Sequence, residues 1–228
     1  MTRLEIQAQA ALLLREGLGT VGAGDPFALD GLTDAVADDV ARRTDCFWSG
    51  VTTDLTQGQD VYCDSSLYKV KGVFVTDAAG CVRPLVTTTE THLDRHFGAG
   101  YWRNAPPSDP PTCAAFQGVR NVRLYPTPSV TRAAGLMLEG YMTPRGKWAA
   151  GADECPLPAL AHQAVVYGLC RLRALQFAGE VAGAMEKAQG WSSEYRRELG
   201  DIERLAATYA PRESLFLAGY RLRGVVAL

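Results

Sequence analysis

The sequence contains few of the residues that most active sites need. Among its 228 residues there are three histidines and six cysteines, with neither a G-x-S-x-G string nor a Cys-x-x-Cys pair. These absences argue against a serine hydrolase, a dithiol redox site and a clustered zinc site. We therefore expect no catalytic residues, no metal and no cofactor, and predict that the chain is not an enzyme.

Long hydrophobic runs are also missing. The main charge-free apolar stretch, residues 157–170, ends at Arg171 and is shorter than the ~20 residues of a membrane helix. Glu5, Gln7 and Gln9 interrupt what would be the apolar region of a signal peptide. We predict a protein that is made and assembled in the cytoplasm, has no membrane partner and keeps its cysteines as free buried thiols.

The composition is that of a folded protein, with 47% hydrophobic and 21% charged residues and a net charge of −2. A chain of this length buries roughly 70 to 75% of its unfolded surface, which is enough for a large core. Acidic residues outnumber basic ones in residues 1–60, and the reverse holds in residues 61–228. This asymmetry favours self-assembly or a partner surface over extensive coating of nucleic acid.

Helical patterns occupy both ends of the chain. A capping box at residues 2–5 and the apolar residues Leu4, Ala8, Ala11 and Leu12 predict a helix over 3–16. Glycines break it, and a second helix is predicted over 31–45.

Two further helices are predicted near the C-terminus. Residues 156–158 open a long one with an apolar stripe from Leu157 to Leu175. The next ends at Pro211 and carries a stripe at spacings of three or four: Trp191, Tyr195, Leu199, Ile202, Leu205 and Tyr209. We expect this stripe to pack on the preceding one.

The middle of the chain has β-branched and aromatic runs between turn residues. They predict strands at 61–63, 67–76, 81–86, 114–117, 119–125 and 136–142, with a short helix at 88–97. The predicted fold class is α+β: mainly an α-helical bundle, formed by the N-terminal helices and two long C-terminal helices, with a β-rich middle insertion and an extended C-terminal tail. We assign residues 1–58 and 150–210 to the bundle as one discontinuous domain, 59–149 to the insertion and 211–228 to the tail.

Several motifs suggest a site, but each has a simpler structural explanation. Residues 17–22 match G-x-G-x-x-G, yet a helix precedes them and Asp25-Pro26 follows, which favours a linker over a dinucleotide site. His92 and His96 could share a helical face, but Leu93 stands where zinc proteases have a glutamate. We expect exposed or locally hydrogen-bonded histidines there and a partly buried His162.

Three stretches together carry a resemblance to a known family. They are residues 32–41 followed by Asp45, Cys46 and Phe47; residues 122–128 running into 136–141 and Pro144; and residues 156–158 opening a helix, with Trp191 and Tyr195 in the next one. In the order of its elements and in their residue types the chain resembles the head-to-tail connector proteins of tailed bacteriophages, also called adaptor or head completion proteins.

The resemblance implies a structural virion protein of the neck. Its copies would form a ring of about twelve subunits beneath the portal vertex, joining the portal protein to the tail or a stopper protein and extending the DNA channel. Contact with double-stranded DNA would be transient and non-specific, because the basic residues of the chain are scattered along the sequence. No catalytic residues carry over, since the family is not enzymatic.

The C-terminus is the predicted portal-binding segment, by its position in the family layout. Its apolar residues show neither a helical nor a strand period, so we predict that they do not complete this chain's own core. The candidate residues are Leu215, Phe216, Leu217, Tyr220, Arg221, Leu222, Arg223, Val225, Val226 and Leu228. Two alternatives stay open: another neck or tail-completion protein, and a small cytoplasmic enzyme whose site is assembled from distant residues.

Overall fold

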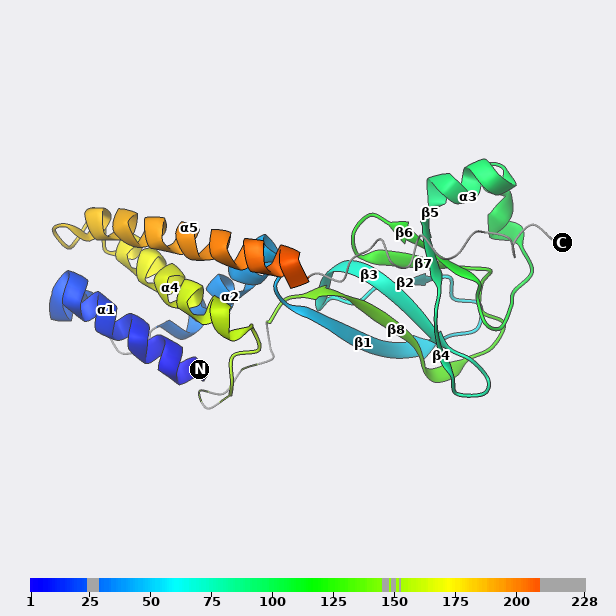
Figure 1. Ribbon diagram of the computed structural model, residues 1–228, viewed down its shortest axis with the longest axis horizontal. Helices are drawn as coiled ribbons and strands as arrows, with labels where there is room; N and C mark the ends of the chain where they lie inside the picture. The colour runs from blue at the N-terminus through cyan, green and yellow to red at the C-terminus, as the bar shows by residue number, and fades with distance from the viewer. Residues whose placement is uncertain (24–28, 145–147, 149–150, 152, 210–228) are drawn as a thin grey trace.

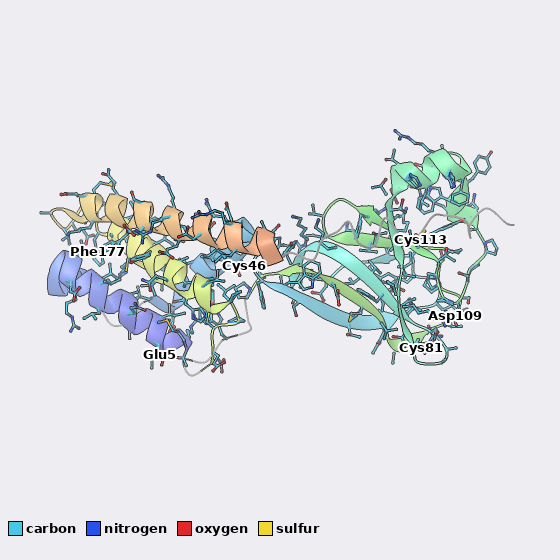
Figure 2. All side chains as sticks on the ribbon, viewed as in Figure 1. Glu5, Cys46, Cys81, Asp109, Cys113 and Phe177 are labelled. Carbon is cyan, nitrogen blue, oxygen red and sulfur yellow. The ribbon has the colours of Figure 1, made fainter. Side chains whose placement is uncertain are left out.

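Helices and strands are separated along the long axis of the molecule. The computed structural model describes residues 1–23, 29–144, 148, 151 and 153–209. Four of its helices gather at one end and two β-sheets lie at the other (Figure 1). Phe177 marks the outer end of the helical part, and Cys46 lies where the chain passes into the sheets (Figure 2).

The helical part is organised around one central helix. It contains α1 (Arg3–Ala23), α2 (Asp30–Thr44), α4 (His162–Gln176) and α5 (Ala184–Tyr209). Helix α4 packs against the other three, and the four share one hydrophobic core that includes Leu14, Val36, Leu169 and Ile202. Gly168 lets α4 approach its neighbours closely, because a Cβ atom there would collide with Val36 and Tyr195.

The β part consists of two four-stranded sheets. The first has the order β1-β8-β3-β4, from β1 (Trp48–Leu55), β8 (Arg132–Met142), β3 (Leu67–Thr76) and β4 (Val82–Pro84). The second has the order β2-β7-β6-β5, from β2 (Val61–Tyr62), β7 (Asn121–Tyr125), β6 (Cys113–Gln117) and β5 (Val86–Thr89). Pairing is antiparallel except between β5 and β6, which are parallel.

Both sheets contribute to one apolar core, and a small helical cap covers part of the second. The shared core includes Leu67, Val73, Leu124 and Leu138. The cap consists of α3 (Glu90–Phe97) and the 3-10 helix η2 (Tyr101–Asn104), which bury Leu93 and Trp102 against Ala115 of β6.

The predicted fold class, mainly an α-helical bundle with two long C-terminal helices, is wrong. Two four-stranded sheets form a large part of the described residues. Of the two C-terminal helices only α5, with 26 residues, is long, whereas α4 has 15. The apolar stripe from Leu157 starts before the α-helix does, because Pro158 is extended (ψ 147°) and the 3-10 helix η3 (Ala159–Ala161) separates it from α4.

Some predicted boundaries also change. Helix α1 continues through the glycines to Ala23, and Gly17 is a packing position, since a Cβ atom there would lie 2.8 Å from the Trp191 ring. Strand β1 was not predicted: it lies within residues 1–58 yet pairs with β8, so the chain enters the sheets at Trp48 and not at residue 59. The division into separate domains stays a prediction. The predictions for α2 and β3 are confirmed, with α2 shifted by a single residue.

Candidate interaction surfaces

The predicted portal-binding residues, Leu215 to Leu228, lie outside the described residues. Among the described residues, candidate surfaces occur on the helical part, at the junction and on the cap over the second sheet.

The outward face of α1 combines apolar residues with the exposed charged residues Glu5, Arg15 and Glu16. Leu4 and Leu12 are 42% and 55% exposed, and Ala8 between them is also exposed. Together with Ala11 these residues carry the helical spacing in the sequence, but of the four only Ala11 is buried; the core also receives Ile6, Ala10 and Leu14, which are fully buried. Because α1 is apolar on most sides, its periodicity does not decide which face turns inward.

Polar contacts fix the rotation of α1. Arg3 and Gln7 are buried and reach α2: Arg3 Nη1 lies 2.7 Å from Asp34 Oδ1, and Gln7 Nε2 donates to Asp30 Oδ1 at 2.7 Å. Turning the helix to bury Leu4 and Leu12 would expose these bonded groups and break the contacts. The outward position of the apolar residues is thus set by the polar ones.

The outward face of α5 carries ion pairs. Arg197 pairs with Glu194 at 2.6 Å and with Glu198 at 3.2 Å, and Arg204 pairs with Asp201 one turn further on. Exposed pairs of this kind satisfy one another and contribute little to stability. This face of α5 is typical of one that water covers.

The junction between the two parts is braced by charged and aromatic side chains. Asp45, which follows α2 in a left-handed conformation (φ 48°), pairs with Lys69 at 2.7 Å and accepts a hydrogen bond from Tyr68 at 2.9 Å. Tyr141 of β8 stacks on Tyr68 and meets Trp48 edge-on. Burial, followed by the nearby Asp45 carboxylate, raises the pKa of Tyr68, so its hydroxyl stays a donor at neutral pH.

A shallow hollow of about 260 Å³ opens at this junction. It is lined by Arg43, Thr44, Asp45, Tyr141, Glu203, Ala206 and Ala207. Typical sites for small molecules measure ~300 to 1,000 Å³ and are largely enclosed and apolar. The hollow is smaller, open and lined by both charged and uncharged groups, so we interpret it as a gap between packed elements and not as a cofactor site.

The cap over the second sheet is held by a polar network. Glu90 accepts from Arg123 and Gln117, at 2.7 and 2.6 Å, and Asp94 accepts from the indole N–H of Trp102 at 2.7 Å. Tyr101, next to the buried Trp102, is 75% exposed. The cap therefore exposes the Tyr101 ring, while hydrogen bonds hold the residues beneath it in place.

Groups capable of chemistry are dispersed in the described residues. His92 and His96 of α3 are exposed and stack with ring centroids 5.8 Å apart, and no group of three or more metal-ligating side chains occurs in the part of the chain that the structure describes. Burial raises the pKa of Cys113 to about 11 and that of Cys170 to about 12, so both stay thiols at neutral pH. Cys155 and Cys170 are buried, but Cys63 and Cys81 are exposed, so the prediction of buried thiols holds only in part.

Comparison with protein families gives a match over most of the chain. The family model described as SU10 adaptor protein matches residues 1–214, nearly the whole chain. No curated protein matches the sequence significantly. Among the described helices, none has the combined length and hydrophobicity needed to cross a membrane.

Proposed function

The chain belongs to the SU10 adaptor family of phage head-to-tail adaptor proteins, and we propose that its copies form a ring that joins the portal to the tail. As a member of this family it is a phage adaptor and a component of the virion neck. The finer proposal is that the ring contains about twelve copies and extends the DNA channel. The observation that carries the proposal is the family match over residues 1–214.

The shape of the molecule supports a connecting role. It is elongated, with a helical part at one end and a β part at the other (Figure 1), so its two ends can meet different partners. Exposed large apolar residues occur on both parts, among them Leu12 on α1 and Tyr101 in the cap. Aromatic residues such as Tyr101 are enriched where proteins contact one another.

The contacts at the junction fix the orientation of the β part relative to the helical part. Asp45 is bonded to both Tyr68 and Lys69, which ties the end of α2 to strand β3. In a ring, a fixed angle between the parts would place every β part equivalently relative to the helical parts. We propose that the helical part forms the ring body and that the β part meets the tail or stopper protein.

The portal-binding role of the C-terminus stays a proposal that rests on the sequence alone. The same holds for transient, non-specific contact with double-stranded DNA, assembly in the host cytoplasm and the lack of an enzymatic activity. The structural role of the family supports the last of these.

Negative-stain electron microscopy of the purified chain, alone and mixed with portal protein of the same phage, tests the proposal. We expect closed rings seated on the portal. A chain that binds tail proteins but never the portal would overturn the assignment in favour of another neck or tail-completion protein. A chain that binds neither and never forms rings would overturn it altogether.

A further inference from the structure

Strand β1 has one side that no other described strand pairs with. It is the outermost strand of the first sheet, next to β8, and runs from the junction along the margin of the β part (Figure 1). The N–H of Met142 donates to the carbonyl of Phe47 at 2.9 Å, and bonding alternates along an antiparallel pair. Every second residue from Phe47 onward therefore bonds to β8, and the residues between them direct their N–H and C=O groups outward. The outward-bonding residues are Trp48, Gly50 and Thr52, which we call the β1 edge.

The β1 edge lacks the features that normally protect an outer strand. Folded proteins limit unwanted pairing by short outer strands, by proline or by charge. The other outer strands of the two sheets fit this rule: β2 has two residues, β4 has three that include Arg83 and Pro84, and β5 has four. Strand β1 has eight residues, with neither proline nor a basic residue. Its one charged residue, Asp54, accepts the Ala134 N–H at 2.8 Å and is thereby turned toward β8.

We propose that the β1 edge binds an extended segment of the tail or stopper protein as an additional strand of the first sheet. The inference rests on the proposed function, in which the β part meets that protein, and it names the surface through which they meet. The row of outward N–H and C=O groups defines the chemistry of the ligand, because an extended backbone matches it. In strand addition, main-chain hydrogen bonds supply affinity and alternate side chains supply specificity.

The side chains of β1 specify the segment further. Val51 is partly buried against the core shared by the two sheets, whereas Gly50 and Thr52 are exposed on the opposite face of the strand. An added strand would place every second side chain beside Val51, where an apolar residue extends the core, and the others beside small groups in water. We therefore expect a segment of about five to eight residues without proline, in which apolar and polar side chains alternate.

A second copy of this chain fits the β1 edge less well. Two β1 edges would meet as identical surfaces about a twofold axis, which closes a pair and not a ring. Pairing with a different outer strand of a neighbouring copy would use at most the four residues of β5 and leave half of β1 unpaired. The described strands thus offer no outer strand of matching length other than β1 itself, which favours a segment from a different protein.

A proline in the β1 edge tests the proposal. Thr52→Pro removes an outward N–H that β8 does not use, and proline is tolerated in an outer strand when its nitrogen faces solvent. The matched control, Thr52→Val, keeps the N–H and changes only the side chain. The full chain, free and on portal protein, is co-sedimented with purified tails of the same phage. We expect Thr52→Pro to bind the tails about tenfold more weakly or worse, with Thr52→Val, portal binding and melting temperatures unchanged. Wild-type binding of the tails by Thr52→Pro would overturn the inference.

Residue-resolved hydrogen exchange of the wild-type chain identifies the occupant and needs no variant to fold. With tails bound, exchange should slow at least tenfold at the N–H groups of Gly50 and Thr52 and change little at Val51 and Thr53, which β8 already protects. Slowing produced by chain concentration alone, by the portal alone or only when residues 210–228 are present would assign the β1 edge to another occupant and overturn the inference. Rings that bind tails without slowing at Gly50 and Thr52 would overturn it while the proposed function stands; if the chain forms no rings and binds neither portal nor tails, both fail.

Discussion

Tyr68 and Asp45 connect the two parts of the molecule. The Tyr68 hydroxyl lies 2.9 Å from Asp45 Oδ1 and 2.7 Å from the carbonyl oxygen of Ala41 in the last turn of α2. Lys69 holds the other carboxylate oxygen of Asp45 at 2.7 Å. Two consecutive residues of β3 thereby hold the C-terminal end of α2, next to the point where the chain crosses between the parts.

Replacing Tyr68 by phenylalanine tests this connection. The variant keeps the ring stacked on Tyr141 but leaves Asp45 and the α2 carbonyl without the donor, so we expect the free energy of unfolding to fall by about 1 to 3 kcal/mol. Chemical denaturation measures the loss, and hydrogen exchange should rise at the end of α2. The control is Tyr101→Phe, whose ring is 75% exposed; equal effects of the two variants would contradict the role given to Tyr68.

Two helical glycines should respond oppositely to alanine. A Cβ atom at Gly168 of α4 would collide with Val36 and Tyr195, whereas one at Gly190 of α5 meets nothing within 4 Å. We expect Gly168→Ala to lose about 1 to 3 kcal/mol through overpacking and Gly190→Ala to gain about 0.5 to 1 kcal/mol through helix propensity. Thermal denaturation compares them, and a stabilised Gly168→Ala variant would show that α4 packs less closely than described.

The sequence predicted those elements whose pattern allows one explanation. Helix α2 and strand β3 were predicted nearly at their observed bounds, because one has a clear apolar face and the other a β-branched run. Strand β1 was missed because it contains the polar residues Ser49, Thr52 and Asp54. Its place in the sheet comes from pairing with β8. Such long-range pairing leaves no local signal in the sequence.

The candidate surfaces were less predictable than the fold. The spacing of Leu4, Ala8 and Leu12 predicts a helix but not which of its faces is buried, and the contacts of Arg3 and Gln7 with α2 decide which face turns inward. A buried arginine next to two acidic residues far along the chain cannot be recognised from spacing. The predicted C-terminal site remains a prediction from sequence.

The core of the helical part should depend strongly on Leu169. This residue of α4 is fully buried among residues from all four helices, so Leu169→Ala should cost about 2 to 5 kcal/mol of unfolding free energy. Leu175, further along the same helix, is 44% exposed and was wrongly predicted to face the core. Urea denaturation of Leu169→Ala and Leu175→Ala should give a large and a small loss; similar losses would show that the core lies elsewhere.

His162 should make stability depend on pH. It is buried, donates from Nε2 to the carbonyl of Leu157 at 3.0 Å, and burial lowers its pKa below the usual 6.5. Above pH 6.5 the imidazole is neutral in both the folded and the unfolded chain. Below pH 6.5 the unfolded chain binds a proton more readily than the folded chain does, so the free energy of unfolding decreases as the pH is lowered.

Denaturation at several pH values between 5 and 8 should therefore show a decline below about pH 6.5 that is smaller in His162→Gln. His92→Gln is the control, since His92 is exposed on α3. An unchanged decline in His162→Gln would assign the pH dependence to other groups.

Deleting residues 212–228 tests the proposed portal contact. The apolar residues of this segment follow Pro211 and show neither a helical nor a strand period, so we expect the truncated chain to fold with a nearly unchanged melting temperature. The deleted segment holds seven large apolar residues between 215 and 226, each contributing about 1 to 2 kcal/mol when buried in a partner. Part of that gain is offset by ordering the segment, so one copy should bind weakly and a ring strongly.

Portal binding by the truncated chain should therefore be lost in co-sedimentation. Arg221→Ala with Arg223→Ala separates charge from apolar contact: it should weaken binding and make it less sensitive to salt, because paired charges are screened. A truncated chain that still binds the portal, or one that fails to fold, would falsify the assignment of the C-terminus. The first result would move the portal contact to the described surfaces, and the second would make residues 212–228 part of the fold.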